Sequence, residues 1–378
     1  MTEPVVALVP ERIFDGSRWH EGTALRIRGG RVEEIAPPEA DDRVESLEGW
    51  LVPGFVDLQV NGGGGALLNN DCTSEGIARI CAAHAAGGTT AVMVTLITDR
   101  PEAAPAAIAA VAAARAAGQA GLLGLHLEGP HLSVARQGTH DPALIRPMTD
   151  ADLAVVAAAP GRVGHLVTTV APESVSAEQV RALAAAGVVV SLGHTDADAV
   201  AARGHVEAGA RMVTHLFNAM SQLGHRAPGL VGVALDDPRI ASGLIADGFH
   251  VDPAAMGIAL RAVKGRIFLV TDAMSTIGTD LPGFTLNGRQ VYRRGGRLTL
   301  ADGTLAGADI DMIASVRFVV KRLGLPLEEA LRMAALYPAE AVGAATRGAL
   351  GPGMKADAVL LSPALEVRGT WIDGRRVA

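Results

Sequence analysis

The sequence predicts an α/β protein built on a (β/α)8 barrel of the TIM type, with a small β-sandwich domain formed by both chain termini. Two observations support the barrel. Short β-rich runs alternate with alanine-rich helical runs through the middle of the chain. These β-rich runs are almost continuously apolar, as expected for parallel strands buried on both faces. A third observation supports the second domain: both flanks show shorter runs, alternating in polarity or broken by turns.

The barrel is expected over residues 54–344, between the two flanks. Four helical runs lie at Ser74–Ala86, Pro105–Ala117, Ala177–Ala186 and Pro253–Val263; Thr73 precedes the first as a cap and Gly87 stops it. Eight β-rich runs favour a closed barrel, with a doubly wound open sheet as the competing architecture. The predicted strands are Phe55–Val60, Thr89–Leu96, Leu122–Leu127, Val163–Val170, Val188–Leu192, Met212–His215, Ala241–Ala246 and Ile267–Thr271.

Residues 1–53 and 345–378 are predicted to form the small β domain together, because neither piece is large enough to fold comfortably alone. A further irregular stretch near 281–307 carries the hairpin signals Asn287-Gly288, Gly295-Gly296 and Asp302-Gly303. It is interpreted either as a cover over a site or as a surface hairpin. The strands expected in the flanks are Val5–Val9, Ala24–Ile27, Arg31–Ile35, Val44–Leu47, Ala358–Leu361, Glu366–Arg368 and Thr370–Ile372.

Composition and charge narrow the classes of function. Hydrophobic residues make up 49% of the 378 residues, which supplies a large core and excludes global disorder. The net charge is −7 with no basic run, so no nucleic acid partner is expected. The apolar stretches are interrupted by Arg, Pro or Gly, so no membrane span is expected. The start of the chain lacks a basic signal region, and Cys72 and Cys81 fit no CxxC motif, so we expect a cytoplasmic protein.

Polar side chains gather where the predicted barrel strands end, which is where such barrels carry their working residues. If the barrel closes, a glutamate, two histidines and an aspartate meet at one spot. Imidazole and carboxylate are good ligands for Zn²⁺ or a similar divalent ion, and three protein ligands plus water form an open, catalytic arrangement. A separate carboxylate could move protons between water and a leaving group. The pattern therefore matches a metallohydrolase, and its four residues are Glu128, His194, His215 and Asp272.

Six motifs occur in order along the barrel. They are Leu127-Glu128-Gly129-Pro130, Gly138-Thr139-His140, Ser191-Leu192-Gly193-His194-Thr195, Thr214-His215-Leu216-Phe217-Asn218-Ala219-Met220, Ala246-Asp247-Gly248-Phe249-His250-Val251-Asp252 and Leu269-Val270-Thr271-Asp272-Ala273. This ordered set resembles that of the N-acetylglucosamine-6-phosphate deacetylases of the amidohydrolase superfamily. The segments 52–57 and 353–358 also resemble that superfamily, so the resemblance covers nearly the whole chain.

The resemblance implies hydrolysis of N-acetylglucosamine 6-phosphate to glucosamine 6-phosphate and acetate, in amino-sugar catabolism. It implies that Glu128, His194 and His215 bind the metal. It implies that Asp272 is the general base for water and then the acid for the departing amine. His140, with Thr139, is implied to contact the substrate and to polarise its carbonyl group.

The resemblance also implies a phosphate site and a subunit arrangement. Enzymes of the family it resembles are homodimers, so the resemblance implies a homodimer. A neighbouring subunit is expected to help complete the phosphate site. The phosphate would be held by Arg226, by His250 and by Asn218 and Ala219 through the backbone. The further substrate-contacting loop is Leu305, Ala306 and Gly307.

Two departures from the resemblance matter. Gln59-Val60-Asn61 stands where many amidohydrolases carry His-x-His for a second metal. An amide is a poor ligand for Zn²⁺, so we expect one divalent ion per subunit. Zn²⁺ suits the ligand types best, with Fe²⁺, Co²⁺ and Mn²⁺ as alternatives. Gln59 is expected either to contact a water on the metal or simply to pack. After Gly307, Ala308 stands where a small hydroxyl residue is expected.

Two other functions stay open at this stage. A deacylase of another N-acyl amino sugar or of an N-acyl amino acid would keep the same metal and base motifs, and Arg226 with His250 is the feature that discriminates. A non-catalytic sugar-phosphate binder would keep the fold, but it would have no need of Asp272 as a proton shuttle.

Overall fold

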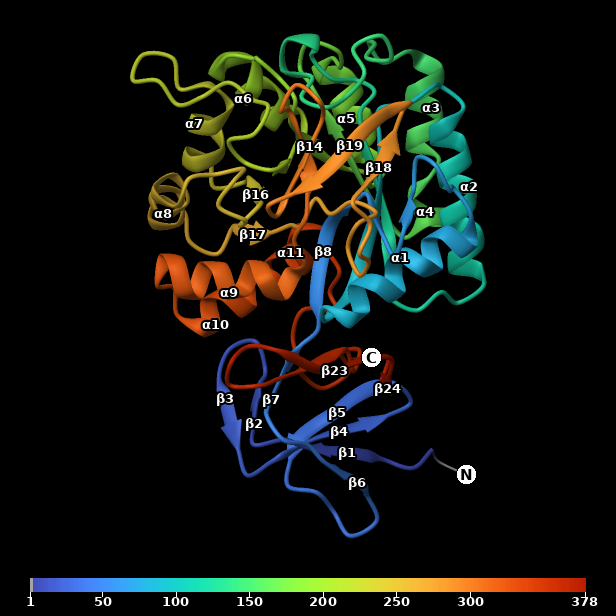
Figure 1. Ribbon diagram of the computed structural model, residues 1–378, viewed down its shortest axis with the longest axis vertical. Coiled ribbons are helices and arrows are strands. Elements are labelled where there is room, and N and C mark those ends of the chain that lie inside the picture. The colour runs from blue at the N-terminus through green and yellow to red at the C-terminus, as the bar shows by residue number, and fades with distance from the viewer. Residues whose placement is uncertain (1–2) are drawn as a thin grey trace.

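The computed structural model describes residues 3–378 and centres on an eight-stranded parallel sheet (Figure 1). Each predicted barrel strand coincides with one strand of this sheet, and the strands pair in chain order. The runs predicted to end at His215, Ala246 and Thr271 each stop two residues earlier. The run predicted from Val163 begins at His165, because Val163 ends a short helix. The strands are β8 (Phe55–Val60), β11 (Thr89–Ile97), β12 (Leu122–Glu128), β13 (His165–Val170), β14 (Val189–Leu192), β15 (Met212–Val213), β16 (Ala241–Leu244) and β17 (Ile267–Leu269).

The sheet closes on itself between β8 and the segment that follows β17. The backbone N–H of Asp272 donates to the Gln59 carbonyl at 2.9 Å, and the N–H of Asn61 donates to the Ala273 carbonyl at 2.9 Å. These bonds continue the parallel ladder around the barrel. The predicted barrel is therefore confirmed, and the doubly wound open sheet is excluded, since its edge strands would stay unpaired.

Helices surround the barrel. The helix predicted at Ser74–Ala86 is α1, and the Thr73 side chain accepts a hydrogen bond from the N–H of Gly76, as its capping role requires. The second predicted helix begins at Ala103 rather than Pro105, because a proline in the first turn removes only an N–H that the helix does not use. The described helices are α1 (Ser74–Ala86), α2 (Ala103–Ala116), α3 (Asp150–Ala157), α4 (Pro160–Val163), α5 (Ala177–Ala185), α6 (Ala199–Ala208), α7 (Gly229–Asp236), α8 (Pro253–Ala262), α9 (Met312–Leu323), α10 (Leu327–Ala334) and α11 (Leu336–Ala341), with a 3-10 turn, η1 (Val134–Arg136).

The flanks of the chain form two further sheets, below the barrel in Figure 1. In the larger sheet, β22 (Ala358–Leu361) from the C-terminal flank pairs with β7 (Trp50–Pro53) from the N-terminal flank. The sheets share one apolar cluster that includes Leu8 and Trp371, so they pack as the predicted sandwich. One sheet has the order β5 (Arg31–Ala36), β4 (Ala24–Arg28), β1 (Val6–Val9), β6 (Arg43–Ser46), and the other has β24 (Arg375–Arg376), β23 (Val367–Ile372), β22, β7, β2 (Arg12–Phe14), β3 (Trp19–Glu21).

Two details of these flanks differ from the expectation. The runs predicted at Glu366–Arg368 and Thr370–Ile372 form the single strand β23, because Gly369 stays in the ladder opposite Leu360. The strands β2, β3 and β24 were not predicted, since each has only two or three residues, and β7 was not predicted either. The domain boundaries expected at 53/54 and 344/345 stay a prediction.

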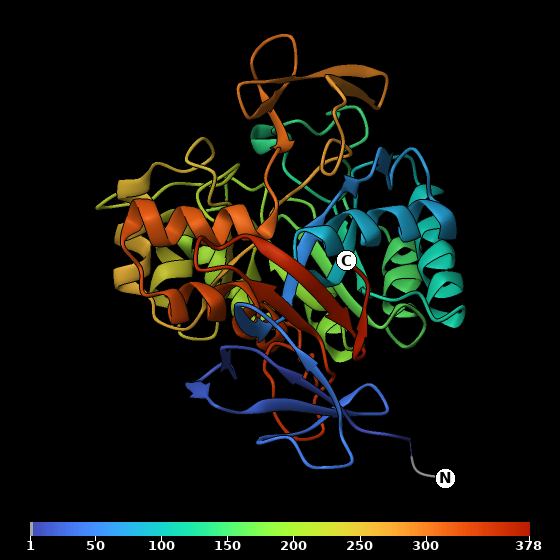
Figure 2. The same cartoon turned by 60° about the horizontal axis from the view of Figure 1, so that its bottom comes forward.

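The stretch near 281–307 forms a four-stranded antiparallel sheet, here called the roof sheet. It lies over the end of the barrel opposite the terminal sheets, as Figure 2 shows. Asn287 and Gly288 both have positive φ, 46° and 75°, and make the two-residue turn between β18 and β19. This position favours the interpretation as a cover. The strands are β18 (Gly283–Leu286), β19 (Arg289–Arg294), β20 (Arg297–Thr299) and β21 (Leu305–Ala308).

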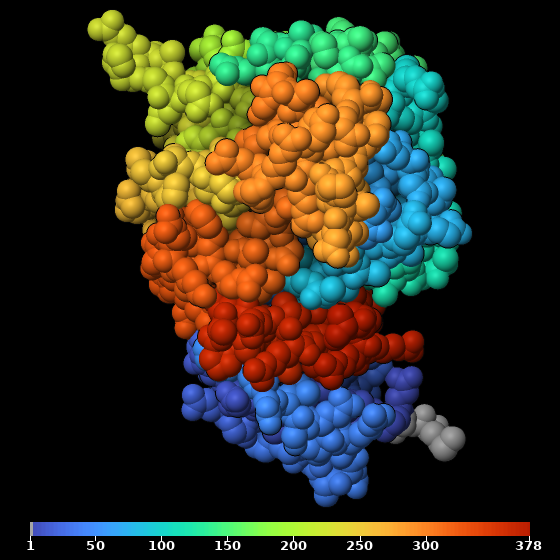
Figure 3. Space-filling model, in the orientation of Figure 1, coloured from blue at the N-terminus to red at the C-terminus, as the bar shows by residue number. Residues whose placement is uncertain are grey.

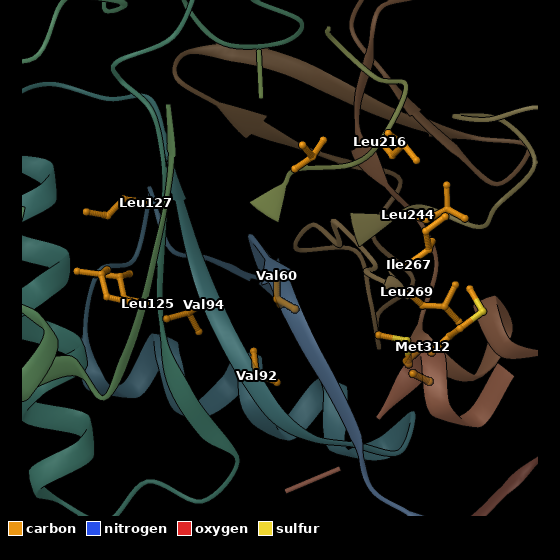
Figure 4. Close-up of a cluster of buried hydrophobic side chains, with 14 of the residues drawn as sticks. Val60, Val92, Val94, Leu125, Leu127, Leu216, Leu244, Ile267, Leu269 and Met312 are labelled. Carbon is orange, nitrogen blue, oxygen red and sulfur yellow. The ribbon is translucent and has the colours of Figure 1, made fainter. Parts of the chain in front are cut away.

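Two further features set the surroundings of the barrel. The loop between β15 and α7 projects from the body of the molecule, at the upper left of Figure 3. Outward-facing strand residues pack against helices in the largest apolar cluster, where Leu269 of β17 lies near Met312 of α9 (Figure 4). No helix within residues 3–378 has the length and apolar character needed to cross a bilayer.

Candidate metal centre and active site

Three buried side chains converge at the carboxyl ends of three barrel strands. Glu128 ends β12, His194 follows β14 and His215 follows β15. The Nε2 atoms of the two histidines are 3.0 Å apart, and each lies 3.0–3.1 Å from Oε1 of Glu128. Both histidines have positive φ, 47° and 29°, so the backbone turns sharply to aim them inward.

The chemistry of these atoms suits a divalent cation. Nδ1 of His194 donates to the Arg136 carbonyl at 2.9 Å, which leaves Nε2 with its lone pair facing Glu128. Burial raises the pKa of Glu128, but the close approach of the His194 and His215 rings outweighs burial and holds that pKa well below its usual value. The centre therefore offers one carboxylate and two imidazole nitrogens, which is a zinc-type donor set.

A second carboxylate, Asp272, lies beside this centre. Asn61 donates to Oδ1 of Asp272 at 2.7 Å, and Nε2 of Gln59 lies 3.2 Å from both Asp272 and Glu128. Burial and then the charge of Glu128 raise the pKa of Asp272 to about 6. A carboxylate that titrates near neutrality is suited to take up and release a proton. Gln59, expected either near a water or packed, bridges the two carboxylates.

These groups lie in a cavity of about 240 Å³. Most of the predicted site residues line it, and Thr304 and Leu305 bring the roof sheet to its rim. The predicted site residues in its wall are Glu128, Thr139, His140, His194, His215, Asn218, Ala219, His250, Asp272, Leu305 and Gly307.

The structure does not bring every predicted residue into this wall. Ala306 is buried in the apolar cluster of the roof sheet and does not line the cavity. Arg226 is exposed on the projecting loop between β15 and α7. It was expected at the phosphate, but it does not line the cavity of its own chain.

Sequence reasoning missed several wall residues. Ile97 and Ile245 read only as core residues of strands, and Met274 follows Asp272 without a polar signal. Thr304 follows the Asp302-Gly303 turn, so its place at the rim depends on how the roof sheet folds back. Phe217 and Ala219 have positive φ, 79° and 49°, which also shapes the wall. Neither residue type favours this backbone conformation, so the sequence gives no signal for it.

His250 is oriented by a neighbouring carboxylate. Its Nδ1 lies 2.6 Å from Oδ2 of Asp247, and its backbone N–H donates to Oδ1 of the same residue at 2.9 Å. Burial raises the pKa of Asp247. The hydrogen bond with His250 and the charge of that ring lower it by a larger amount, so the net pKa lies below the usual value. Asp247 therefore stays an anion and fixes the ring that lines the cavity.

The chain belongs to the amidohydrolase family, whose pattern matches residues 50–377. It is 42% identical over 328 residues to an N-acetylgalactosamine-6-phosphate deacetylase from Shewanella sp. (strain ANA-3), covering 86% of this chain and 82% of that protein. It is 37% identical to the human N-acetylglucosamine-6-phosphate deacetylase, covering 93% and 91%. The crystal structure of N-acetylglucosamine-6-phosphate deacetylase from Pasteurella multocida superposes with a TM-score of 0.94 at 32% identity, covering 98% and 99%.

Replacement of one imidazole in the centre should abolish metal binding. In His215→Gln an amide stands in place of a nitrogen ligand, so the metal content after dialysis should fall from about one ion per chain to nearly none. Elemental analysis of protein purified without chelator measures this. The exposed His225→Gln is the matched control and should keep its metal; full metal content in His215→Gln would remove His215 from the centre.

Proposed function

We propose that the protein hydrolyses the acetamide group of N-acetylglucosamine 6-phosphate, giving glucosamine 6-phosphate and acetate. The observation that carries this proposal is the meeting of Glu128, His194 and His215 with Asp272 in one cavity. Such a set combines a cation site with a proton carrier, which is what hydrolysis of an amide requires. Relatives that span nearly the whole chain are named for this deacetylation.

We propose one divalent ion per subunit, held by Glu128, His194 and His215. When bound, such an ion polarises a carbonyl group and lowers the pKa of a water molecule. The amide nitrogens of Gln59 and Asn61 donate to the carboxylates beside this centre. An N–H donor is not a metal ligand, which supports a single ion. Zn²⁺ suits the two nitrogens and one oxygen best, with Fe²⁺, Co²⁺ or Mn²⁺ as alternatives.

We propose a separate role in the hydrolysis for each of four residues. Asn61 and Gln59 hold Asp272, whose carboxylate takes a proton from the water that attacks the carbonyl carbon. His140 donates a hydrogen bond to the carbonyl oxygen as negative charge develops there. As the carbon–nitrogen bond breaks, Asp272 returns its proton to the amine nitrogen. Amide and water thus become amine and acetate.

The other end of the substrate would occupy the opposite part of the cavity. We propose that His250, held by Asp247, binds the sugar phosphate together with Asn218 and the backbone of Ala219. Thr139 would contact the sugar beside His140. The roof-sheet segment Leu305, Ala306 and Gly307 would contact it from above, with Ala306 acting only by packing behind the other two.

A second candidate substrate is N-acetylgalactosamine 6-phosphate, which the relative from Shewanella is named for acting on. The experiment that tests the proposal is acetate release from both phosphosugars, from their unphosphorylated forms and from N-acetyl amino acids, on metal-loaded protein. We expect the highest kcat/KM with N-acetylglucosamine 6-phosphate. A higher value with the galactose epimer would replace the first substrate by the second. Equal values without phosphate, or turnover only of N-acyl amino acids, would exclude both, and no turnover at all would favour a sugar-phosphate binder.

Asp272→Asn should separate catalysis from binding. The amide keeps the size and hydrogen bonds of the side chain but accepts no proton, so kcat should fall about 10²–10⁴-fold. Metal content and KM should change little. Steady-state kinetics with elemental analysis checks this, with Asp236→Asn on the exposed face of α7 as control. Unchanged turnover would remove Asp272 from the reaction.

We propose a homodimer in which Arg226 serves the neighbouring subunit's phosphate site. The residue is exposed on the projecting loop and does not line the cavity of its own chain, while phosphate recognition favours an arginine. A loop that projects from one subunit can reach the site of another.

We propose the cytoplasm as the location of the protein. The free cysteines Cys72 and Cys81 are consistent with a reducing compartment.

Mixing two inactive variants tests this arrangement. Arg226→Ala lacks the proposed phosphate contact, and Asp272→Asn lacks the proton carrier. In a mixed dimer the Arg226→Ala chain keeps Asp272 and receives Arg226 from its partner. Reassociation at equal amounts should therefore restore about a quarter of the wild-type activity. Mixing Arg226→Ala with the double variant should restore none. If both mixtures stay inactive, or if the protein is monomeric by light scattering, the proposal is wrong.

A further inference from the structure

We propose that Thr98 is a positioning residue that decides which ring nitrogen of His140 carries the proton. This inference deepens the proposed function, because it concerns the group that would donate to the substrate carbonyl. Thr98 directly follows β11, and His140 lies in the loop after η1. Both side chains are buried, at 1% and 2% exposure, and they meet at the wall of the cavity.

The hydroxyl of Thr98 has one close partner. Its Oγ1 lies 2.7 Å from Nδ1 of His140, but 3.5 Å from the Glu128 carbonyl oxygen. The longer distance lies outside the range in which a hydroxyl donates effectively to an oxygen. The single proton of the hydroxyl therefore goes to Nδ1, which accepts it with a lone pair.

This bond determines the tautomer of His140. The ring is buried and has no carboxylate bonded to it within the described residues, so it is neutral and carries one N–H. Since Nδ1 accepts from Thr98, the proton sits on Nε2. Nδ1 is turned towards Thr98, so Nε2 is the nitrogen left to face the cavity.

The tautomer decides whether His140 can act on a carbonyl group. With its proton on Nε2, the ring donates to a carbonyl oxygen, and the bond strengthens as that oxygen becomes negative. In the other tautomer, Nε2 would present a lone pair and repel the same oxygen. Thr98 does not line the cavity, so it acts through His140.

The roof sheet and a glycine hold this pair in place. Asn287 donates to the Thr98 carbonyl at 3.2 Å, and Arg289 donates to the Thr139 carbonyl, one residue before His140, at 2.5 Å. At Gly129 any Cβ would lie 2.3 Å from Oγ1 of Thr98, so only glycine leaves room for the hydroxyl. The turn between β18 and β19 thus fixes both partners of the hydrogen bond.

Nitrogen NMR of the zinc-loaded protein tests the assignment directly. With ¹⁵N-labelled histidine, long-range correlations distinguish protonated from unprotonated ring nitrogens, and the His140 signals are those missing from His140→Gln. We expect a protonated Nε2 and an unprotonated Nδ1 in the wild type and in Thr98→Ser. In Thr98→Val, which keeps the shape but loses the hydroxyl, the pattern should become mixed. A protonated Nδ1 in the wild type, or an unchanged pattern in Thr98→Val, would overturn the inference.

Kinetics supplies the second measurement. Thr98→Val should lower kcat about tenfold, the effect of one hydrogen bond, with KM changed less than about twofold. Thr98→Ser should restore the wild-type kcat. Thr370→Val is the matched control, because it removes a buried hydroxyl that bonds the Ala85 carbonyl at 2.8 Å, far from the cavity. An equal loss in Thr98→Ser and Thr98→Val would contradict the role of the hydroxyl. If the NMR pattern holds but no amide substrate is hydrolysed, the proposed function fails while the tautomer assignment stands.

Discussion

The backbone pairing that closes the barrel is the constraint on which the site depends. The bonds between Gln59 and Asp272, and between Asn61 and Ala273, join the two ends of the sheet. They place the first strand's amides beside the last strand's carboxylate. Only in a closed barrel do β12, β14 and β15 direct their ends at that same point. Residues more than 200 positions apart thus become neighbours through main-chain geometry alone, before any side chain interacts.

Closure also creates an electrostatic problem, which side chains resolve. Two carboxylates lie close together, Glu128 buried and Asp272 half-buried, and like charges held out of water repel. Imidazole groups face the first, so it remains an anion, while burial and the charge of Glu128 raise the pKa of the second. The environment thus gives two carboxyl groups pKa values on opposite sides of their usual range. The same principle operates at the far wall, where Asp247 stays charged and orients His250.

Much of this was predictable because it depends on local patterns. The strands could be predicted from continuous apolar runs, and the cap of α1 from Thr73 and Gly87. The convergence of Glu128, His194, His215 and Asp272 follows once closure is assumed. The rest depends on how distant segments meet. The exposure of Arg226 follows from the path of one loop, and the burial of Ala306 from the way β21 faces. Thr98 carries no motif, and only its 2.7 Å contact with His140 distinguishes it from a core threonine.

The left-handed backbone at His194, His215 and Asp272 has an evolutionary consequence. Each conformation costs an L-residue on the order of 1–3 kcal/mol, which glycine or asparagine would largely avoid. Drift towards a more stable chain would therefore tend to erase these side chains first. A lineage released from selection for activity could thus gain folding stability as it lost activity. Among proteins descended from this one, glycine or asparagine at these three turns would identify a member that has lost activity better than overall sequence divergence would.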